Sequence, residues 1–136
     1  MATGRPRPLS PHLSIWRWRV HTIVSIVHRL CGNAMAFGAV PLFVWWLAAA
    51  ASGEAAYADF HALTEGTMGY VALVVAIGFS WSLFQHMSSG IRHLVMDTGA
   101  AFDIHTSKIT STAAFVSGAV LTILLWGTIF LTKGFN

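Results

Sequence analysis

Three long stretches without Asp, Glu, Lys or Arg dominate the pattern of hydrophobic and polar positions along the chain. They cover residues 30–51, 66–91 and 109–132. At about 1.5 Å per helical residue, the first stretch alone reaches roughly 33 Å, enough to cross the core of a bilayer. The pattern predicts an all-α membrane protein with three transmembrane helices, at about residues 22–51, 66–96 and 109–132.

The composition supports this class. Of the 136 residues, 55% are hydrophobic and only 10% are charged, whereas a soluble domain carries roughly 25% charged residues. The few basic residues are scattered and form no nucleic-acid-binding patch. Cys31 is the single cysteine, and the chain has no C-x-x-C-H motif, so any haem would be held without a covalent attachment.

The charged residues outside the three stretches predict the orientation. Cytoplasmic flanks of membrane proteins carry an excess of Lys and Arg. Basic residues precede the first helix and flank the connection from the second to the third, whereas the first connection is acidic; only Lys133 opposes this trend. We therefore expect the N-terminus in the cytoplasm and the C-terminus outside. The basic residues are Arg5, Arg7, Arg17, Arg19, Arg92 and Lys108, and the acidic ones are Glu54, Asp59 and Glu65.

Residues 1–21 are expected to form a cytoplasmic arm, and residues 22–136 a transmembrane domain. The arm lacks the apolar region of a cleaved signal peptide, and its prolines at positions 6, 8 and 11 disfavour helix before His12. In SIWRWRV, two tryptophans alternate with two arginines. This pattern suits the headgroup layer of a membrane or contact with a soluble partner.

The second helix carries Gly78, Ser82, His86, Gly90 and His93 at spacings that stack them on one face. Small residues at such spacing also allow close helix packing. Ionisable residues inside a span mark a site by default, however, and a flat macrocycle needs bare helix surface beside its iron ligand. We interpret His86 as a haem ligand.

His93 lies about 10.5 Å along the helix from His86. Two axial ligands of one iron lie on opposite sides of the ring, with nitrogens about 4 Å apart. One straight helix cannot supply both at this spacing, so the second ligand must come from elsewhere. His93 is better suited to the haem edge or to a polar interface.

The first helix contains Ser25 and Arg29 one turn apart. A lipid-facing arginine near the middle of a span costs roughly 2.5–3.5 kcal/mol, unless its side chain extends to the interface. The functional alternative is that Arg29 meets a haem propionate or a quinone carbonyl, with Ser25 as a second hydrogen-bond donor. Asp97, after the second helix, lies where it can pass protons to such a pocket.

Three motifs in order resemble the cytochrome b membrane-anchor subunit of succinate dehydrogenase, complex II: RPLSPHLSIWRW, SIVHRLCG and HMSSGIRHLVMD. The resemblance implies that His86 is one axial ligand of a b-type haem and that a histidine of a second small anchor subunit is the other. It also implies a ubiquinone site at Ser25 and Arg29, with His28 near the haem propionates.

The resemblance further implies the partners. The arm would contact an iron–sulfur subunit, which receives electrons from a flavoprotein that oxidises succinate, and ubiquinone would be reduced at the cytoplasmic boundary of a bacterial inner membrane. No residue of this chain would oxidise succinate itself.

Two alternatives remain open from the sequence. One is a haem-free anchor of the fumarate-reductase type, or the cytochrome b subunit of another respiratory dehydrogenase. The other is a purely structural membrane assembly subunit. A small transporter is disfavoured, because the chain has no inverted repeat and no pair of glycine- or proline-interrupted spans.

Overall fold

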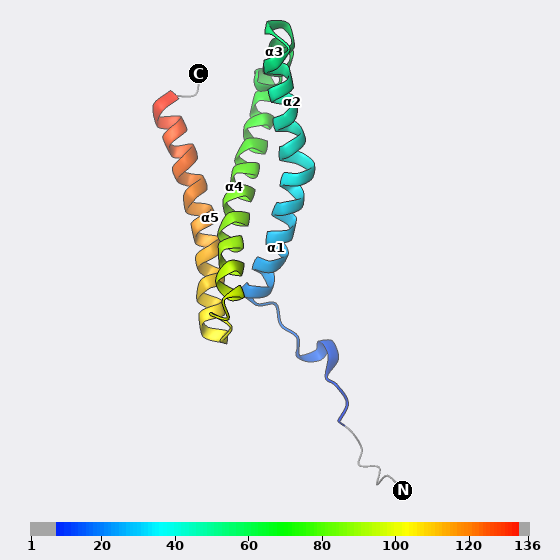
Figure 1. The fold of residues 1–136 in the computed structure, drawn as a ribbon, viewed down its shortest axis with the longest axis vertical. Helices are drawn as coiled ribbons and strands as arrows, with labels where there is room; N and C mark the ends of the chain where they lie inside the picture. Colours follow the sequence, from blue (N-terminus) through cyan, green and yellow to red (C-terminus); the bar gives the residue numbers. More distant parts are fainter. Residues whose placement is uncertain (1–7, 134–136) are drawn as a thin grey trace.

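A computed structural model describes residues 8–133 and shows three long helices that run side by side (Figure 1). The first comprises α1 (Val20–Ala34), a π-helical turn, η2 (Met35–Ala39), and α2 (Val40–Ala51); the second is α4 (Gly66–Asp97) and the third is α5 (Ile104–Lys133). Each is long and apolar enough to cross a membrane, and the described residues form no strand. The predicted all-α fold with three spans is confirmed.

Helix α5 begins at Ile104, five residues before the predicted start. Asp103 explains the difference, because its Oδ1 accepts a hydrogen bond from the backbone N–H of Thr106 at 2.9 Å. A side-chain oxygen before the first turn satisfies an N–H that the helix itself leaves unpaired. The polar residues after Asp103 therefore continue the helix beyond the apolar stretch.

The first membrane helix contains the π-helical turn just before Pro41. Within it, Val40 N–H donates to the carbonyl of Met35, five residues back. Proline has no N–H and its ring crowds the preceding turn, and such a turn is one way in which a helix adjusts. Gly38 lies in the same turn against α4, where a Cβ would lie 2.6 Å from Phe79 Cζ.

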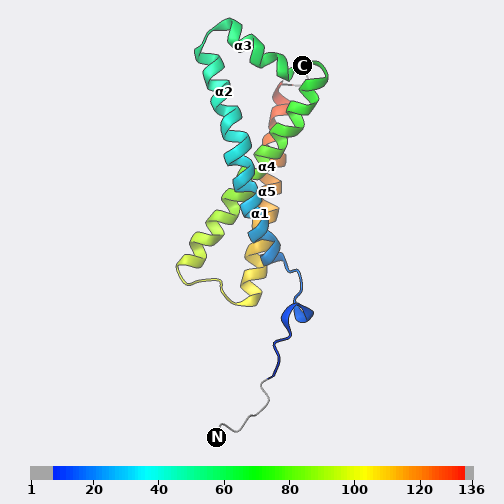
Figure 2. The ribbon, with the colours of Figure 1, turned by 90° about the vertical axis from the view of Figure 1, so that its right-hand side faces the viewer.

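The connection from α2 to α4 is helical, which the sequence analysis did not predict. It consists of α3 (Glu54–His61) and the short 3-10 helix η3 (Ala62–Thr64). Imidazole Nδ1 of His61 lies 3.3 Å from Glu65 Oε1 after η3. Eight helical residues are too few for a clear periodic pattern. Helix α3 lies at the end of the bundle opposite the N-terminal arm (Figures 1 and 2).

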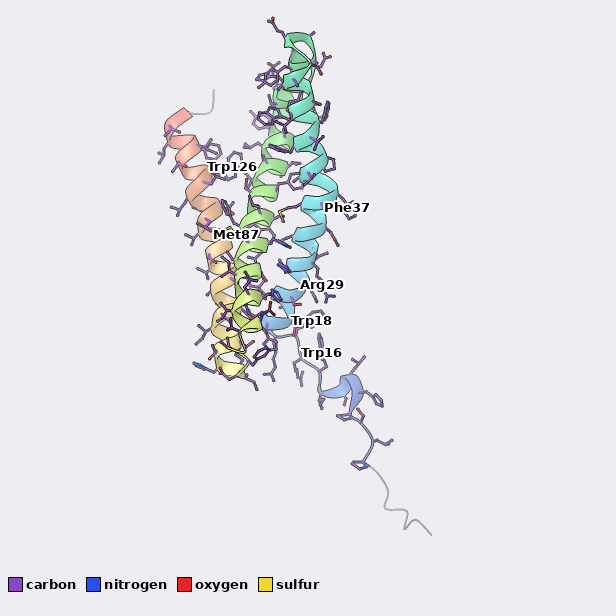
Figure 3. All side chains as sticks on the ribbon, in the orientation of Figure 1. Trp16, Trp18, Arg29, Phe37, Met87 and Trp126 are labelled. Carbon is purple, nitrogen blue, oxygen red and sulfur yellow. The ribbon has the colours of Figure 1, made fainter. Side chains whose placement is uncertain are left out.

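The arm follows the predicted behaviour from Pro8 onward, since no helix precedes the 3-10 helix η1 (His12–Ile15). The rings of Trp16 and Trp18 pack edge to face with centroids 4.5 Å apart, at the end of the bundle where α1 begins (Figure 3). Residues 1–7, with Arg5, Pro6 and Arg7, lie outside the described residues. The cytoplasmic orientation of this end stays a prediction.

Helix α4 packs against both α1 and α5 (Figure 2). Few of the described side chains are fully buried, and the largest of them are Gln85, Val24, Ser89 and Ser111, all polar except Val24. Large apolar side chains instead cover the outer faces, as expected where lipid replaces water around a bundle. Polar groups between the helices therefore define the candidate sites.

Candidate functional site

Three histidines meet between α1 and α4. The rings of His28 and His86 are stacked, with centroids 3.9 Å apart and an angle of 9° between their planes. The ring of His93 lies 5.0 Å from that of His28, tilted by 39°. His28 comes from α1, and the other two come from α4, about two helical turns apart. The structure thus brings three of the predicted haem-site residues together.

Backbone hydrogen bonds select the tautomer of both α4 histidines. His86 Nδ1 lies 2.9 Å from the carbonyl oxygen of His28, and His93 Nδ1 lies 2.7 Å from that of Ser89. A carbonyl oxygen only accepts, so each Nδ1 must carry the hydrogen and donate it. In the neutral ring the lone pair is then on Nε2. A histidine that binds a metal through one nitrogen has its other N–H held in this way.

Glycines line the histidine cluster, but not in the predicted arrangement. A Cβ on Gly32 of α1 would lie 2.9 Å from His86 Cε1, so Gly32 makes the room beside His86. A Cβ on Gly90 would lie 4.0 Å from His28 Cε1, and one on Gly78 would meet nothing within 4 Å. The predicted stripe on α4 is therefore divided. His86, Gly90 and His93 contact α1, whereas Gly78 is exposed.

The stacked pair does not form two opposite ligands of one iron. Opposite axial ligands point their nitrogens at each other through the metal, with the macrocycle between them. His28 and His86 instead face each other ring to ring, 3.9 Å apart. Among residues 8–133, no group of three or more His, Cys, Asp or Glu side chains is arranged to hold a metal ion. On His86 itself, Nε2 is the nitrogen left free to bind a group from outside the chain.

Ser25 and Arg29 lie on α1, and Figure 3 shows Arg29 near the end of the bundle from which the arm extends. Ser25 is partly buried, whereas the Arg29 side chain is exposed. Arg29 makes no hydrogen bond or ion pair with any residue between Pro8 and Lys133. The structure therefore leaves its guanidinium free of the histidine cluster and available to a group outside this chain.

Arg92 is a basic residue near the end of α4. Its side chain is buried between α4 and α5 with 8% exposure. Nε donates to Thr110 Oγ1 at 3.2 Å, and Nη2 donates to Ser107 Oγ at 3.1 Å. Arg92 is therefore a link between two helices. Asp97, the last residue of α4, is exposed, and its predicted role in proton transfer stays a prediction.

Sequence reasoning also missed a polar seam between α4 and α5. On α4 it contains Gln85 and Ser89, one turn apart and fully buried, and on α5 it contains Ser111 and Gly118. Both amide atoms of Gln85 and the hydroxyls of the two serines are buried without a partner in the described part of the chain. The signal was present as residues spaced by three and four positions: Gln85, Ser89 and Arg92 on α4, and Ser111, Ala114, Gly118 and Thr122 on α5.

Comparison with known proteins places these features in a family. The family model described as "Succinate dehydrogenase/Fumarate reductase transmembrane subunit" matches residues 3–125. The chain is 36% identical over 118 residues to the succinate dehydrogenase cytochrome b556 subunit of Paracoccus denitrificans, covering 87% of this chain and 88% of that protein. It is 37% identical over 120 residues to the subunit of the same name from Rickettsia conorii, covering 88% and 90%. It is also similar to the mitochondrial succinate dehydrogenase cytochrome b560 subunit of Sus scrofa, with 33% identity over 122 residues, 89% of this chain and 68% of that protein.

Proposed function

Because the chain belongs to the succinate dehydrogenase/fumarate reductase transmembrane subunit family, we propose that it binds b-type haem through His86 and forms part of a ubiquinone site. It is a multi-pass membrane-anchor subunit of an oxidoreductase complex, with its three spans in α1–α2, α4 and α5. Particular residues of these spans would hold the haem and the quinone.

The tautomer of His86 carries the haem assignment. Its Nδ1–H is donated to the His28 carbonyl at 2.9 Å, which leaves Nε2 as the nitrogen with a lone pair. The ring is only partly buried, so a group from outside the chain can reach it. When bound, haem supplies reversible one-electron chemistry. His86 would hold the iron, and the rings of His28 and His93 would contribute polar contacts near the haem edge and propionates.

A second haem ligand would come from a partner. His28 presents the face of its ring to His86, not a nitrogen, and His93 lies about two turns from His86 along the same helix. We assign this ligand to a histidine of a second small anchor subunit, so that the haem would lie between the two chains and contribute to their association.

Ser25 and Arg29 are proposed to bind the quinone. Arg29 lies nine residues after the start of α1, about 13 Å along the helix, where an unpaired guanidinium is costly. An oxygen or anion from outside the chain would satisfy it. Arg29 is placed to donate hydrogen bonds to a quinone oxygen on which negative charge develops, or to a haem propionate, and Ser25 to hold the quinone by its hydroxyl. Asp97 is proposed to pass protons from the adjacent aqueous boundary.

The same family membership suggests the assembly. We infer partners that include a flavoprotein, which oxidises succinate, and an iron–sulfur subunit in contact with the arm at Trp16 and Trp18. The bacterial relatives favour a bacterial cytoplasmic membrane over the inner mitochondrial membrane. The bilayer surrounds the remaining apolar faces.

A difference spectrum tests the haem assignment. We expect His86→Ala to remove the reduced-minus-oxidised b-type signal from the purified complex, whereas His105→Ala, an exposed histidine on α5, retains it. An unchanged b-type signal in His86→Ala would overturn the ligand assignment. For the quinone site, Ser25→Ala and Arg29→Ala should lower succinate-dependent quinone reduction while electron transfer to an artificial acceptor persists. Intact quinone reduction in both variants would favour a structural role.

A further inference from the structure

Gly32 lies directly against the imidazole of His86. A Cβ at this position would be 2.9 Å from Cε1 and 3.3 Å from Nδ1 of that ring. The first distance is shorter than real carbon atoms tolerate, so any side chain at position 32 would displace the ring. His86 can therefore approach α1 this closely only because residue 32 is glycine.

The same glycine keeps the carbonyl of His28 open. Within α1, that carbonyl is the helical acceptor for the N–H of Gly32, four residues later. It also accepts a second hydrogen bond, from His86 Nδ1 at 2.9 Å. Because Gly32 has no Cβ, the side of the carbonyl that faces α4 stays accessible to this second donor.

We propose that Gly32 is a positioning residue for the haem ligand: it admits the His86 ring to the His28 carbonyl and so fixes the nitrogen that faces the iron. The proposal rests on the proposed function of His86. A hydrogen bond on the outer nitrogen makes imidazole a more basic ligand, and such bonds tune haem potentials. Without this hydrogen bond, His86 would donate less electron density to the iron. The oxidised haem would then be stabilised less, and its midpoint potential would rise.

Ordinary helix packing is the competing explanation, since small residues allow membrane helices to approach each other. The chain offers controls for it. Gly118→Ala also meets a close neighbour, because a Cβ there would lie 2.6 Å from Gln85 Oε1, but this is at the α4–α5 contact and not at the α1–α4 contact where His86 bonds to the His28 carbonyl. Gly78→Ala places a methyl group on the exposed side of α4, where nothing lies within 4 Å.

The experiment is a redox titration of the b-type absorption in the purified complex, with the electron paramagnetic resonance spectrum of the oxidised haem. We expect Gly32→Ala to raise the midpoint potential and change the spectrum, Gly118→Ala to lower only the thermal stability, and Gly78→Ala to change neither. A wild-type potential and spectrum in Gly32→Ala, or an equal shift in Gly118→Ala, would overturn the proposal.

Two further measurements distinguish a failure of the His86 ligand assignment from a failure of the positioning role of Gly32. If His86→Ala keeps its b-type haem, the ligand assignment has failed; if it loses haem while Gly32→Ala matches the wild type, only the positioning role has failed. If Gly32→Ala does not assemble, electron–nuclear double resonance of the wild-type haem in heavy water takes its place. A proton on the ligand's outer nitrogen that exchanges slowly supports the bond to the His28 carbonyl, and one that exchanges at once contradicts it.

Discussion

His28 contacts His86 in two separate ways: its ring stacks on the His86 ring at 3.9 Å, and its main-chain carbonyl, not its side chain, accepts the hydrogen bond from His86 Nδ1. A substitution at position 28 removes the first contact and leaves the second. The two contacts can therefore be examined independently in the assembled complex.

We expect His28→Ala to retain b-type haem but to hold it less tightly. The carbonyl still selects the Nδ1–H tautomer of His86, whereas the loss of a stacked ring pair is worth about 0.5–1.5 kcal/mol, or up to roughly tenfold in haem retention. The ratio of haem to complex after extended dialysis measures this, with His105→Ala as the control. Complete absence of the b-type spectrum in His28→Ala would show that the side chain, and not the carbonyl, is essential.

Arg92 is expected to stabilise the pairing of α4 with α5. Arg92→Met keeps an unbranched side chain but loses the hydrogen bonds to Thr110 and Ser107, at a cost of about 1–2 kcal/mol, since such bonds contribute modestly inside membranes. Thermal unfolding of the detergent-solubilised complex measures the loss, and Lys108→Met, an exposed cation on α5, is the control. In the variant Arg92→Met, Thr110→Val, the two effects should not add. Equal stability of Arg92→Met and Lys108→Met would contradict this role.

The three spans could be predicted because a long stretch without charge has few alternatives to a membrane helix. The helix boundaries were harder to predict. Helix α5 starts at Ile104 because the side chain of Asp103, which lies outside the apolar stretch, caps its first turn. Helix α3 was not predicted because it is short and lies between two spans, where the hydrophobicity pattern carries little information.

The faces of the helices were harder to predict than their existence. In water the apolar face of a helix indicates the core, but in lipid the outer faces are apolar as well. The spacing along α4 therefore identified His86 as unusual without indicating that Gly32 lies beside it or that Arg92 is buried against α5. Contacts between helices depend on their rotation, which the sequence pattern of a single span leaves open.

The contact between Gly118 and Gln85 should be intolerant of added volume. A Cβ on residue 118 would lie 2.6 Å from Gln85 Oε1 and 3.1 Å from its Cα, so the helix backbones themselves must separate. We expect Gly118→Ala to destabilise the complex by about 1–3 kcal/mol. Gly127→Ala, which meets nothing within 4 Å, is the matched control. Addition of Gln85→Ala should relieve part of the loss, and equal thermal stability of the two glycine variants would refute the close contact.

The first turn of α5 should depend on the charge and the oxygen of Asp103. Hydrogen bonds from the hydroxyl and the N–H of Thr106 lower the pKa of Asp103 from its ordinary value of 3.8. A lowered pKa means that the ionised carboxylate stabilises the folded turn at pH values above 3.8, and that this stabilisation is lost as the pH falls through the lower, folded-state value.

Asp103→Ala should therefore speed hydrogen exchange at the amide of Thr106 near neutral pH, because that N–H loses its acceptor. Asp103→Asn retains a capping oxygen but loses the charge, so its exchange rate should lie between those of the wild type and Asp103→Ala. Amides in the middle of α5 should be unaffected in both variants. If Asp103→Asn exchanges as fast as Asp103→Ala, the carboxylate charge rather than the cap holds the turn, and if neither differs from the wild type, the hydrogen bond to Thr106 does not protect it.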